Sequence, residues 1–216
     1  MTAGPTALVL ARAPRPGRVK RALEPRLGPA GCAALQAVLV RRAAAWARAA
    51  APGAAWLAVE PPDAVEEVAT LVGDGITVFA PAGADRRERL AAAVARAGGG
   101  PLLIAGSDCP RLGAAHAAAM LADLGAGCDA VVGTSLDGDW YVAGLAVPRP
   151  ELLALAPGPA TRSDGFGGIL AAAHELGAEV GVLRIERLLR TAEDMAAHLA
   201  DPLLPAEVRA ALAPGA

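Results

Sequence analysis

The sequence predicts an α/β protein in which a mostly parallel central sheet is covered by helices on both faces. Short apolar runs alternate along the chain with alanine-rich stretches of about 10 to 20 residues that are typical of helices. This alternation is the pattern of βαβ units, whose crossover helices cover both faces of the sheet. The length of 216 residues is ample for one such core, so we expect a single domain over residues 1–216.

The first half of the chain alternates three strands with three helices. The strands are short apolar runs with proline or glycine close to their ends, which is a strand signal. We expect these strands at 7–10, 55–59 and 76–79. A longer alanine-rich or amphipathic stretch follows each run, and its periodicity predicts a helix. We expect these helices at roughly 30–51, 62–72 and 86–97.

The second half continues the alternation, with one exception. We expect its strands at 102–105, 130–133, 140–145 and 180–183, and its helices at 113–124, 167–176 and 191–200. The connection between the strands at 130–133 and 140–145 is too short for a crossover helix, so these two strands are not expected to be parallel neighbours. Thr191, with Asp194 three residues later, forms a capping-box pattern that predicts the start of the last helix.

Composition excludes several classes of protein. Lys and Arg number 20 and Asp and Glu number 22, so the net charge of -2 offers no global field for nucleic acid or for a membrane surface. No apolar run reaches the roughly 18 residues of a membrane span, and no basic region precedes the first apolar stretch as it does in a signal peptide. The three cysteines, Cys32, Cys109 and Cys128, show neither metal-ligand spacing nor an even count, which favours a cytoplasmic location.

The first candidate site is the loop at 11–21, directly after the first strand. Ligands of open α/β sheets bind beyond the carboxyl ends of the strands, and this loop carries five cations in eleven residues. Its prolines stiffen the backbone and Gly17 allows close approach, so the cations can direct donors at an anion. Those best placed to do so are Arg12, Arg18, Lys20 and Arg21. The loop is neither a Walker loop nor a GxGxxG turn, and a solvated basic loop is the alternative interpretation.

Two acidic loops also follow predicted strands. The segment GSDCP at 106–110 places Asp108 after a buried strand, and Asp137 and Asp139 lie in the connection that precedes Trp140. Each has a simpler interpretation, because Asp is common in turns and helix caps and Asp-Gly is a hairpin signal. One cationic and two acidic loops at the same edge would fit a nucleotide diphosphate with a metal ion or sugar hydroxyls beside it.

At these loops the chain resembles a bacterial family of GT-A-fold, glycosyltransferase-like proteins long carried as a domain of unknown function (DUF2064). The family is similar in fold to the molybdopterin and phospholactate nucleotidylyltransferases. Its motif R-x-P-x-P-G-x-x-K-T-R-L resembles Arg12–Leu23, D-L-G-E-R resembles Asp85–Arg89, G-S-D-C-P is intact at Gly106–Pro110, and D-G-G-Y-Y-L-I-G-L resembles Asp137–Leu145. The resemblance extends over about residues 6 to 200.

The resemblance implies a three-layer, Rossmann-like GT-A fold of the nucleotide-diphospho-sugar transferase type. It also implies a glycosyltransferase activity, a nucleotide sugar or nucleotide as ligand, and a divalent metal, Mg or Mn. The catalytic residues would be Asp108, Asp137 and Asp139, with Asp108 also the metal ligand. The nucleotide and its phosphates would be bound by Arg12, Gly17, Arg18, Lys20, Arg21, Asp85, Arg89, Ser107 and Arg190.

The chain departs from the family pattern at the end of its last strand. The family reads D-V-D-T-P-E-D-L there, and this sequence has Leu188 and Arg190 in place of the two first acids. An arginine at a carboxylate position repels a cation, so we expect the metal site to be weak or absent. Ala22 also replaces an arginine that is usual in the family.

Three functions stay open on the sequence. The first is glycosyl transfer from a nucleotide sugar to a small-molecule acceptor. The second is nucleotidylyl transfer, which releases pyrophosphate from a nucleoside triphosphate and would use the same cationic loop. The third is a catalytically silent relative that binds a nucleotide or a partner protein.

Overall fold

The structure is a computed structural model that describes residues 4–153 and 164–213. Its strands are β1 (Thr6–Arg12), β2 (Ala55–Glu60), β3 (Thr77–Phe79), β4 (Leu102–Gly106), β5 (Ala130–Ser135), β6 (Trp140–Leu145) and β7 (Val180–Glu186). Its α-helices are α1 (Glu24–Ala50), α2 (Val65–Val72), α3 (Arg86–Ala95), α4 (Ala114–Gly125), α5 (Asp164–Leu176), α6 (Ala192–Ala200) and α7 (Ala206–Ala211). Short 3-10 turns lie at Arg21–Leu23, Pro62–Ala64 and Pro150–Leu153.

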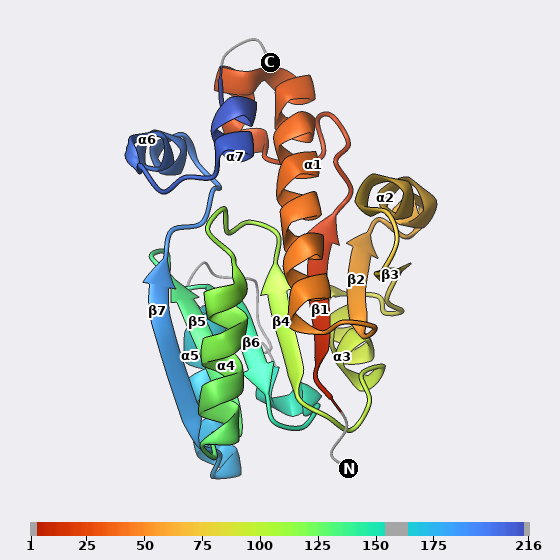
Figure 1. Cartoon of the computed structure of the whole chain (residues 1–216), viewed down its shortest axis with the longest axis vertical. Coiled ribbons are helices and arrows are strands. Elements are labelled where there is room, and N and C mark those ends of the chain that lie inside the picture. The colour runs from red at the N-terminus through yellow and green to blue at the C-terminus, as the bar shows by residue number, and fades with distance from the viewer. Residues whose placement is uncertain (1–3, 154–163, 214–216) are drawn as a thin grey trace.

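The strands form one sheet in the order β3-β2-β1-β4-β6-β5-β7. Strand β6 is antiparallel to both of its neighbours, β4 and β5. The other pairings in the described residues are parallel, so the arrows of the parallel strands point to the same end of the molecule (Figure 1). The predicted mostly parallel sheet is confirmed, and so is the exception at 130–145.

Helices cover both faces of the sheet in three layers. Helices α1 and α4 lie in front of the sheet in the view of Figure 1, and α3 and α5 lie behind it. The core on the α1 and α4 side includes the buried Val9, Trp46, Leu103 and Met120. A second core on the α3 and α5 side is built on residues such as Ile104 and Leu145. The inner strands are mostly buried on both faces, so their runs are apolar without alternation. The edge strands β3 and β7 are partly exposed.

The structure differs from the sequence prediction mainly at helix α1 and at the end of the chain. Helix α1 begins earlier than predicted, because a short first part at Glu24 precedes a break at Gly28, which has φ 67° and ψ 169°. Helix α7 was not predicted. It packs Val208 and Leu212 against Leu23 and Leu35 of the amino-terminal region. The six-residue segment is too short for its periodicity to stand out, and its stability comes from this packing.

The capping box predicted at the start of the last predicted helix is confirmed. The backbone N–H of Asp194 donates to Thr191 Oγ1 at 3.2 Å, and the N–H of Thr191 donates to Asp194 Oδ2 at 2.9 Å. Two of the free N–H groups at the start of α6 are thereby satisfied. This start of α6 also places Arg190, which directly precedes the cap.

A close approach between β5 and β6 shapes the connection between them. A Cβ atom at Gly133 would lie 2.6 Å from Cζ of Tyr141, so only glycine lets the tyrosine ring pack there. The register of the pair shifts directly after Gly133. The Tyr141 hydroxyl donates to the carbonyl of Arg184 at 3.0 Å, which ties β6 to β7. The connection that carries Asp137 and Asp139 is therefore anchored on both sides.

Among the described helices, none has both the length and the apolar character required to cross a membrane.

Candidate functional site

The three loops selected from the sequence meet at one edge of the sheet, beyond the carboxyl ends of the parallel strands. The Nζ atom of Lys20, in the loop after β1, lies 2.6 Å from Oδ1 of Asp108, which follows β4. Arg190, after β7, lies 2.9 Å from both Asp137 and Asp139 in the connection from β5 to β6. The prediction that these loops share one rim is confirmed.

A cleft of about 510 Å³ opens at this edge. It extends from β2 and α3, across the end of β1, to the residues that follow β4 and precede β6. The site residues predicted from the sequence that line the cleft are Arg12, Lys20, Arg89, Ser107, Asp108, Asp139 and Arg190. Its remaining polar lining includes Gln36, Glu60 and Arg86, and apolar side chains such as Leu10, Leu90 and Leu188 complete the wall.

The side chain of Lys20 is buried and fixed by hydrogen bonds, whereas most lysine side chains are exposed. Its backbone adopts the left-handed conformation, with φ 52° and ψ 32°, and its side chain is only 4% exposed. Besides the bond to Asp108, Nζ donates to the carbonyl oxygen of Leu189 at 2.7 Å. A buried ammonium costs several kcal/mol unless it is paired and hydrogen-bonded, and these two oxygens supply both.

Arg190 bonds three carboxylates with three different nitrogens. Its Nε donates to Asp108 Oδ2 at 3.3 Å, Nη1 to Asp137 Oδ2 at 2.9 Å, and Nη2 to Asp139 Oδ2 at 2.9 Å. The Arg190 side chain is about one third exposed and lines the cleft. A planar guanidinium with donors on every side is the side chain best suited to join several carboxylates.

These charges shift the pKa values of the cluster. Burial alone would raise the pKa of Asp108, but the charges and hydrogen bonds of Lys20 and Arg190 outweigh it and hold that pKa below its usual value. The pKa of Asp137 is also lowered, with burial opposed by the hydroxyl of Ser135 and by Arg190. Burial opposes ionisation of Arg190 too, yet the carboxylates of Asp108, Asp139 and Asp137 raise its pKa. The shifts of these three groups therefore favour the charged forms of Asp108, Asp137 and Arg190 at neutral pH.

Other residues selected from the sequence lie elsewhere. The Asp85 carboxylate, selected from the sequence for nucleotide binding, instead accepts from the N–H of Glu88 at 2.8 Å and caps helix α3. Within the described part of the chain, the lining of the cleft does not include Gly17, Arg18 or Arg21, which are exposed. Asp137 also lies outside the lining and reaches the site through Arg190.

Three polar residues of the lining were missed in the sequence. Gln36 is buried within α1 and donates to the carbonyl of Arg12 at 3.2 Å and to Oγ of Ser107 at 3.2 Å, so it joins the end of β1 to the loop after β4. The sequence feature that could have identified Gln36 is a single polar amide in an otherwise alanine-rich predicted helix. Glu60 ends β2 and accepts from Nε of Arg89 at 2.6 Å. An acid at the carboxyl end of a parallel strand is the signal that selected Asp108, and it applied to Glu60 as well. Arg86, the third, lies in the first turn of α3.

A divalent metal ion does not fit the described residues. No three His, Cys, Asp or Glu side chains in residues 4–153 and 164–213 are grouped so as to hold one. Asp108, the metal ligand that the family resemblance implies, instead faces the Arg190 guanidinium together with Asp137 and Asp139. Leu188, at a position where the family has an acid, is 5% exposed and offers no ligand atom.

Solved structures share this fold at low sequence identity. A provisionally named nucleotide-diphospho-sugar transferase from Desulfovibrio desulfuricans G20 superposes with a TM-score of 0.83 at 23% identity, covering 98% of this chain and 94% of that one. A cytidylyltransferase from Leptospira borgpetersenii gives a TM-score of 0.57 at 15% identity, covering 94% and 89%. A Mycobacterium tuberculosis H37Rv protein in complex with manganese gives 0.51 at 20% identity, covering 90% and 97%.

The comparison with family models agrees with the motifs. No curated protein matches the sequence significantly. Residues 43–157 match the model of a family described as uncharacterised proteins conserved in bacteria, DUF2064. That match extends over more than half of the chain and includes the segments 85–89, 106–110 and 137–145. The protein therefore belongs to the DUF2064 family and has the fold of the nucleotide-diphospho-sugar transferases.

Proposed function

We propose that the protein is a glycosyltransferase that binds a nucleotide-sugar donor in the cleft. The observation that carries the proposal is the pair of fixed cations, Lys20 and Arg190, on either side of Asp108 at the carboxyl edge of the sheet. Such cations suit a diphosphate, because N⁺–H donors make the strongest hydrogen bonds to phosphate oxygens. The fold shared with a provisionally named nucleotide-diphospho-sugar transferase supports the same ligand class.

The two ends of the cleft suggest the orientation of the donor. The end at β2 and α3 has the apolar side chains of Leu90 and Pro81 beside the Glu60–Arg89 pair, a setting for the flat faces and polar edge of a base. Strands β2 and β4 are separated by β1, so their ends lie roughly 10 Å apart, at about 4.8 Å per strand. That separation suits a base at one end and a diphosphate at the other.

The transfer requires only groups that the cleft contains. The bond between C1 of the sugar and the diphosphate oxygen breaks, and the diphosphate keeps the electron pair. The acceptor hydroxyl oxygen forms the new bond to C1, and its proton passes to Asp139, the carboxylate next to Arg190 in the cleft lining. Lys20 and Arg190 stabilise the charge that develops on the leaving group, and Asp108 positions both cations.

Thermal unfolding with a panel of ligands tests the binding step. We expect one nucleoside diphosphate among UDP, GDP, CDP and ADP, or its sugar conjugate, to raise the Tm, because a ligand that binds only the folded state stabilises it. Incubation of the matching nucleotide sugar with alcohol acceptors should then release the nucleoside diphosphate. Absence of any shift at millimolar ligand would contradict the proposal.

A second candidate activity has one observation in its favour. The chain shares its fold with a cytidylyltransferase, and the cations that suit a diphosphate also suit a triphosphate. In that reaction a substrate oxygen bonds to the α-phosphorus and pyrophosphate leaves with the electron pair of the broken P–O bond. Release of pyrophosphate from a nucleoside triphosphate would favour this activity over glycosyl transfer. Binding without either turnover would identify a silent relative.

A further inference from the structure

Asp108 is enclosed between two cations that are part of the chain. Its Oδ1 lies 2.6 Å from Nζ of Lys20, and its Oδ2 lies 3.3 Å from Nε of Arg190. Arg190 continues to Asp137 and Asp139, each at 2.9 Å. The carboxylates that could ligate an ion at this edge are thus already joined by a single guanidinium.

The positive charge of the cluster equals that of one divalent metal ion. Lys20 and Arg190 each carry one positive charge, and together they supply the two charges of a magnesium or manganese ion. The three aspartates exceed them by one negative charge, which leaves little attraction for a further cation. A divalent ion between the same carboxylates would lie within a few ångströms of the guanidinium, and like charges at that distance repel.

Both cations retain N–H groups for a ligand. A guanidinium has five N–H groups, and Arg190 uses three of them on the aspartates, one each from Nε, Nη1 and Nη2. An ammonium has three, and Lys20 uses one on Asp108 and one on the carbonyl of Leu189. The two remaining N–H groups of Arg190 and the remaining one of Lys20 can therefore bind phosphate oxygens.

From this arrangement we propose that Arg190, beside the Lys20 that the family motif also contains, takes the place of the divalent cation of the site, so that the protein binds a nucleotide diphosphate without a metal. The replacement is permanent, because both charges are attached to the backbone and held by the aspartates. The identity of the ligand rests on the proposed function. The loss of metal affinity does not, because it follows from the charges and contacts of the cluster alone.

Manganese binding to the protein without nucleotide tests the loss of metal affinity. Electron paramagnetic resonance of free Mn²⁺ measures it directly. We expect no detectable binding to the unmodified protein at 1 mM Mn²⁺, and binding at least tenfold tighter in the variant that carries Leu188→Asp with Arg190→Asp. The matched control carries Arg26→Asp with Leu203→Asp, the same change of composition at two exposed positions. It should bind Mn²⁺ no better than the unmodified protein.

Two outcomes would overturn the replacement. One is micromolar, stoichiometric Mn²⁺ binding by the unmodified protein, and the other is a folded double variant that binds Mn²⁺ no better than its control. If circular dichroism shows that the double variant does not fold, Arg190→Ala provides the same measurement with a smaller change, and its Mn²⁺ affinity should also rise.

Calorimetry with UDP and GDP, each in EDTA and in 1 mM Mn²⁺, tests the nucleotide part. We expect the Kd of the nucleotide that binds to differ by less than tenfold between the two conditions. Nucleotide binding that is lost in EDTA would refute the proposal. If neither nucleotide binds in either condition, the proposed function fails for these bases, and the Mn²⁺ measurement still decides whether Arg190 has taken the place of the metal.

Discussion

Lys20 and Asp108 are 88 residues apart in the sequence, and their charged atoms lie 2.6 Å apart in the structure. Each comes from a loop that follows a parallel strand, and β1 and β4, which carry these loops, are neighbours in the sheet. The pairing is therefore a direct result of strand order. It brings the buried ammonium of Lys20 into the lining of the cleft.

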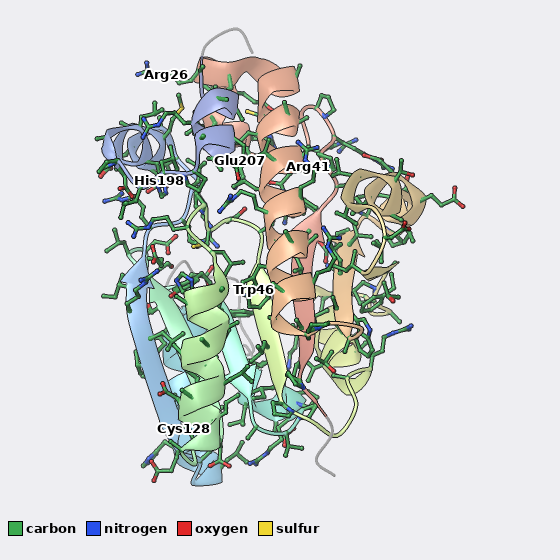
Figure 2. All side chains as sticks on the ribbon, in the orientation of Figure 1. Arg26, Arg41, Trp46, Cys128, His198 and Glu207 are labelled. Carbon is green, nitrogen blue, oxygen red and sulfur yellow. The ribbon has the colours of Figure 1, made fainter. Side chains whose placement is uncertain are left out.

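Replacement of Lys20 by Met should weaken nucleotide binding by at least tenfold, or about 1.4 kcal/mol. The substitution keeps the apolar stem and removes the ammonium, which binds the phosphates in the proposed function. The Lys20 side chain is 4% exposed. Calorimetry with the nucleotide identified by the Tm panel measures the effect. Arg26→Met is the matched control, because Arg26 is exposed near the start of α1 and projects away from the body of the protein (Figure 2). Equal affinities of the two variants would remove Lys20 from the site.

The stability of the protein should fall in acid, and Asp108 should account for part of the decline. Its pKa is lower in the folded protein than in the unfolded chain, so its ionised form stabilises the fold above the unfolded pKa of about 3.9. This stabilisation is lost as the pH falls below about 4 and protons bind the unfolded chain first. Urea unfolding between about pH 6 and pH 3 should therefore show a shallower decline for Asp108→Asn. Some decline in stability should remain in Asp108→Asn, because the pKa of Asp137 is also lowered in the folded protein. Superimposable profiles for the two proteins would count against this role of Asp108.

Gly133→Ala should destabilise the protein by roughly 1–3 kcal/mol, the range for overpacked cores. The added Cβ would lie 2.6 Å from the Tyr141 ring and 2.6 Å from Cγ2 of Val142, and both side chains are buried. Gly125→Ala, at the end of α4, is the control, because nothing lies within 4 Å of its Cβ position and its φ is not in the left-handed region. We expect the control to be neutral or slightly stabilising. Denaturant titrations compare the two, and similar losses in both would show that the contact with Tyr141 is not the cause.

The cysteines should react with iodoacetamide at different rates in the native protein. Burial raises the pKa of the Cys109 thiol to about 12, with a smaller contribution from Glu186, and burial also raises the pKa of Cys32. Cys128 is only partly buried and lies at the opposite end of the sheet from the cleft (Figure 2). Because the thiolate is the reactive form, peptide mapping after alkylation at pH 8 should find Cys128 modified at least tenfold faster than the other two. Rapid modification of Cys109 would show that its surroundings open readily.

Much of the fold could be predicted from local patterns, because these patterns reflect local physics. Apolar runs of four to six residues that alternate with alanine-rich helical stretches are typical of the strands of a mostly parallel sheet, and all seven appear in the sheet. The capping box at Thr191 depends on residues three apart, and it formed as predicted. Helix α7 escaped because nothing within its six residues requires a helix. It depends on Leu23 and Leu35, which are remote in the sequence.

For the candidate site, too, some features could be predicted from the sequence and others depend on the tertiary structure. The sequence by itself determined which loops carry the charges, since a strand that ends in Asp108 or a loop that holds Lys20 is visible in the order of residues. It also determined that Arg190 stands where the family has an acid. Only the tertiary structure decided that Asp85 caps a helix, that Gln36 and Glu60 face the cleft, and that Arg190 bonds Asp108, Asp137 and Asp139 at once. The reason is that a strand pattern specifies only the position of a side chain along its own strand. The residue that this side chain contacts depends on which strands become neighbours. That strand order is set by packing over the whole sheet.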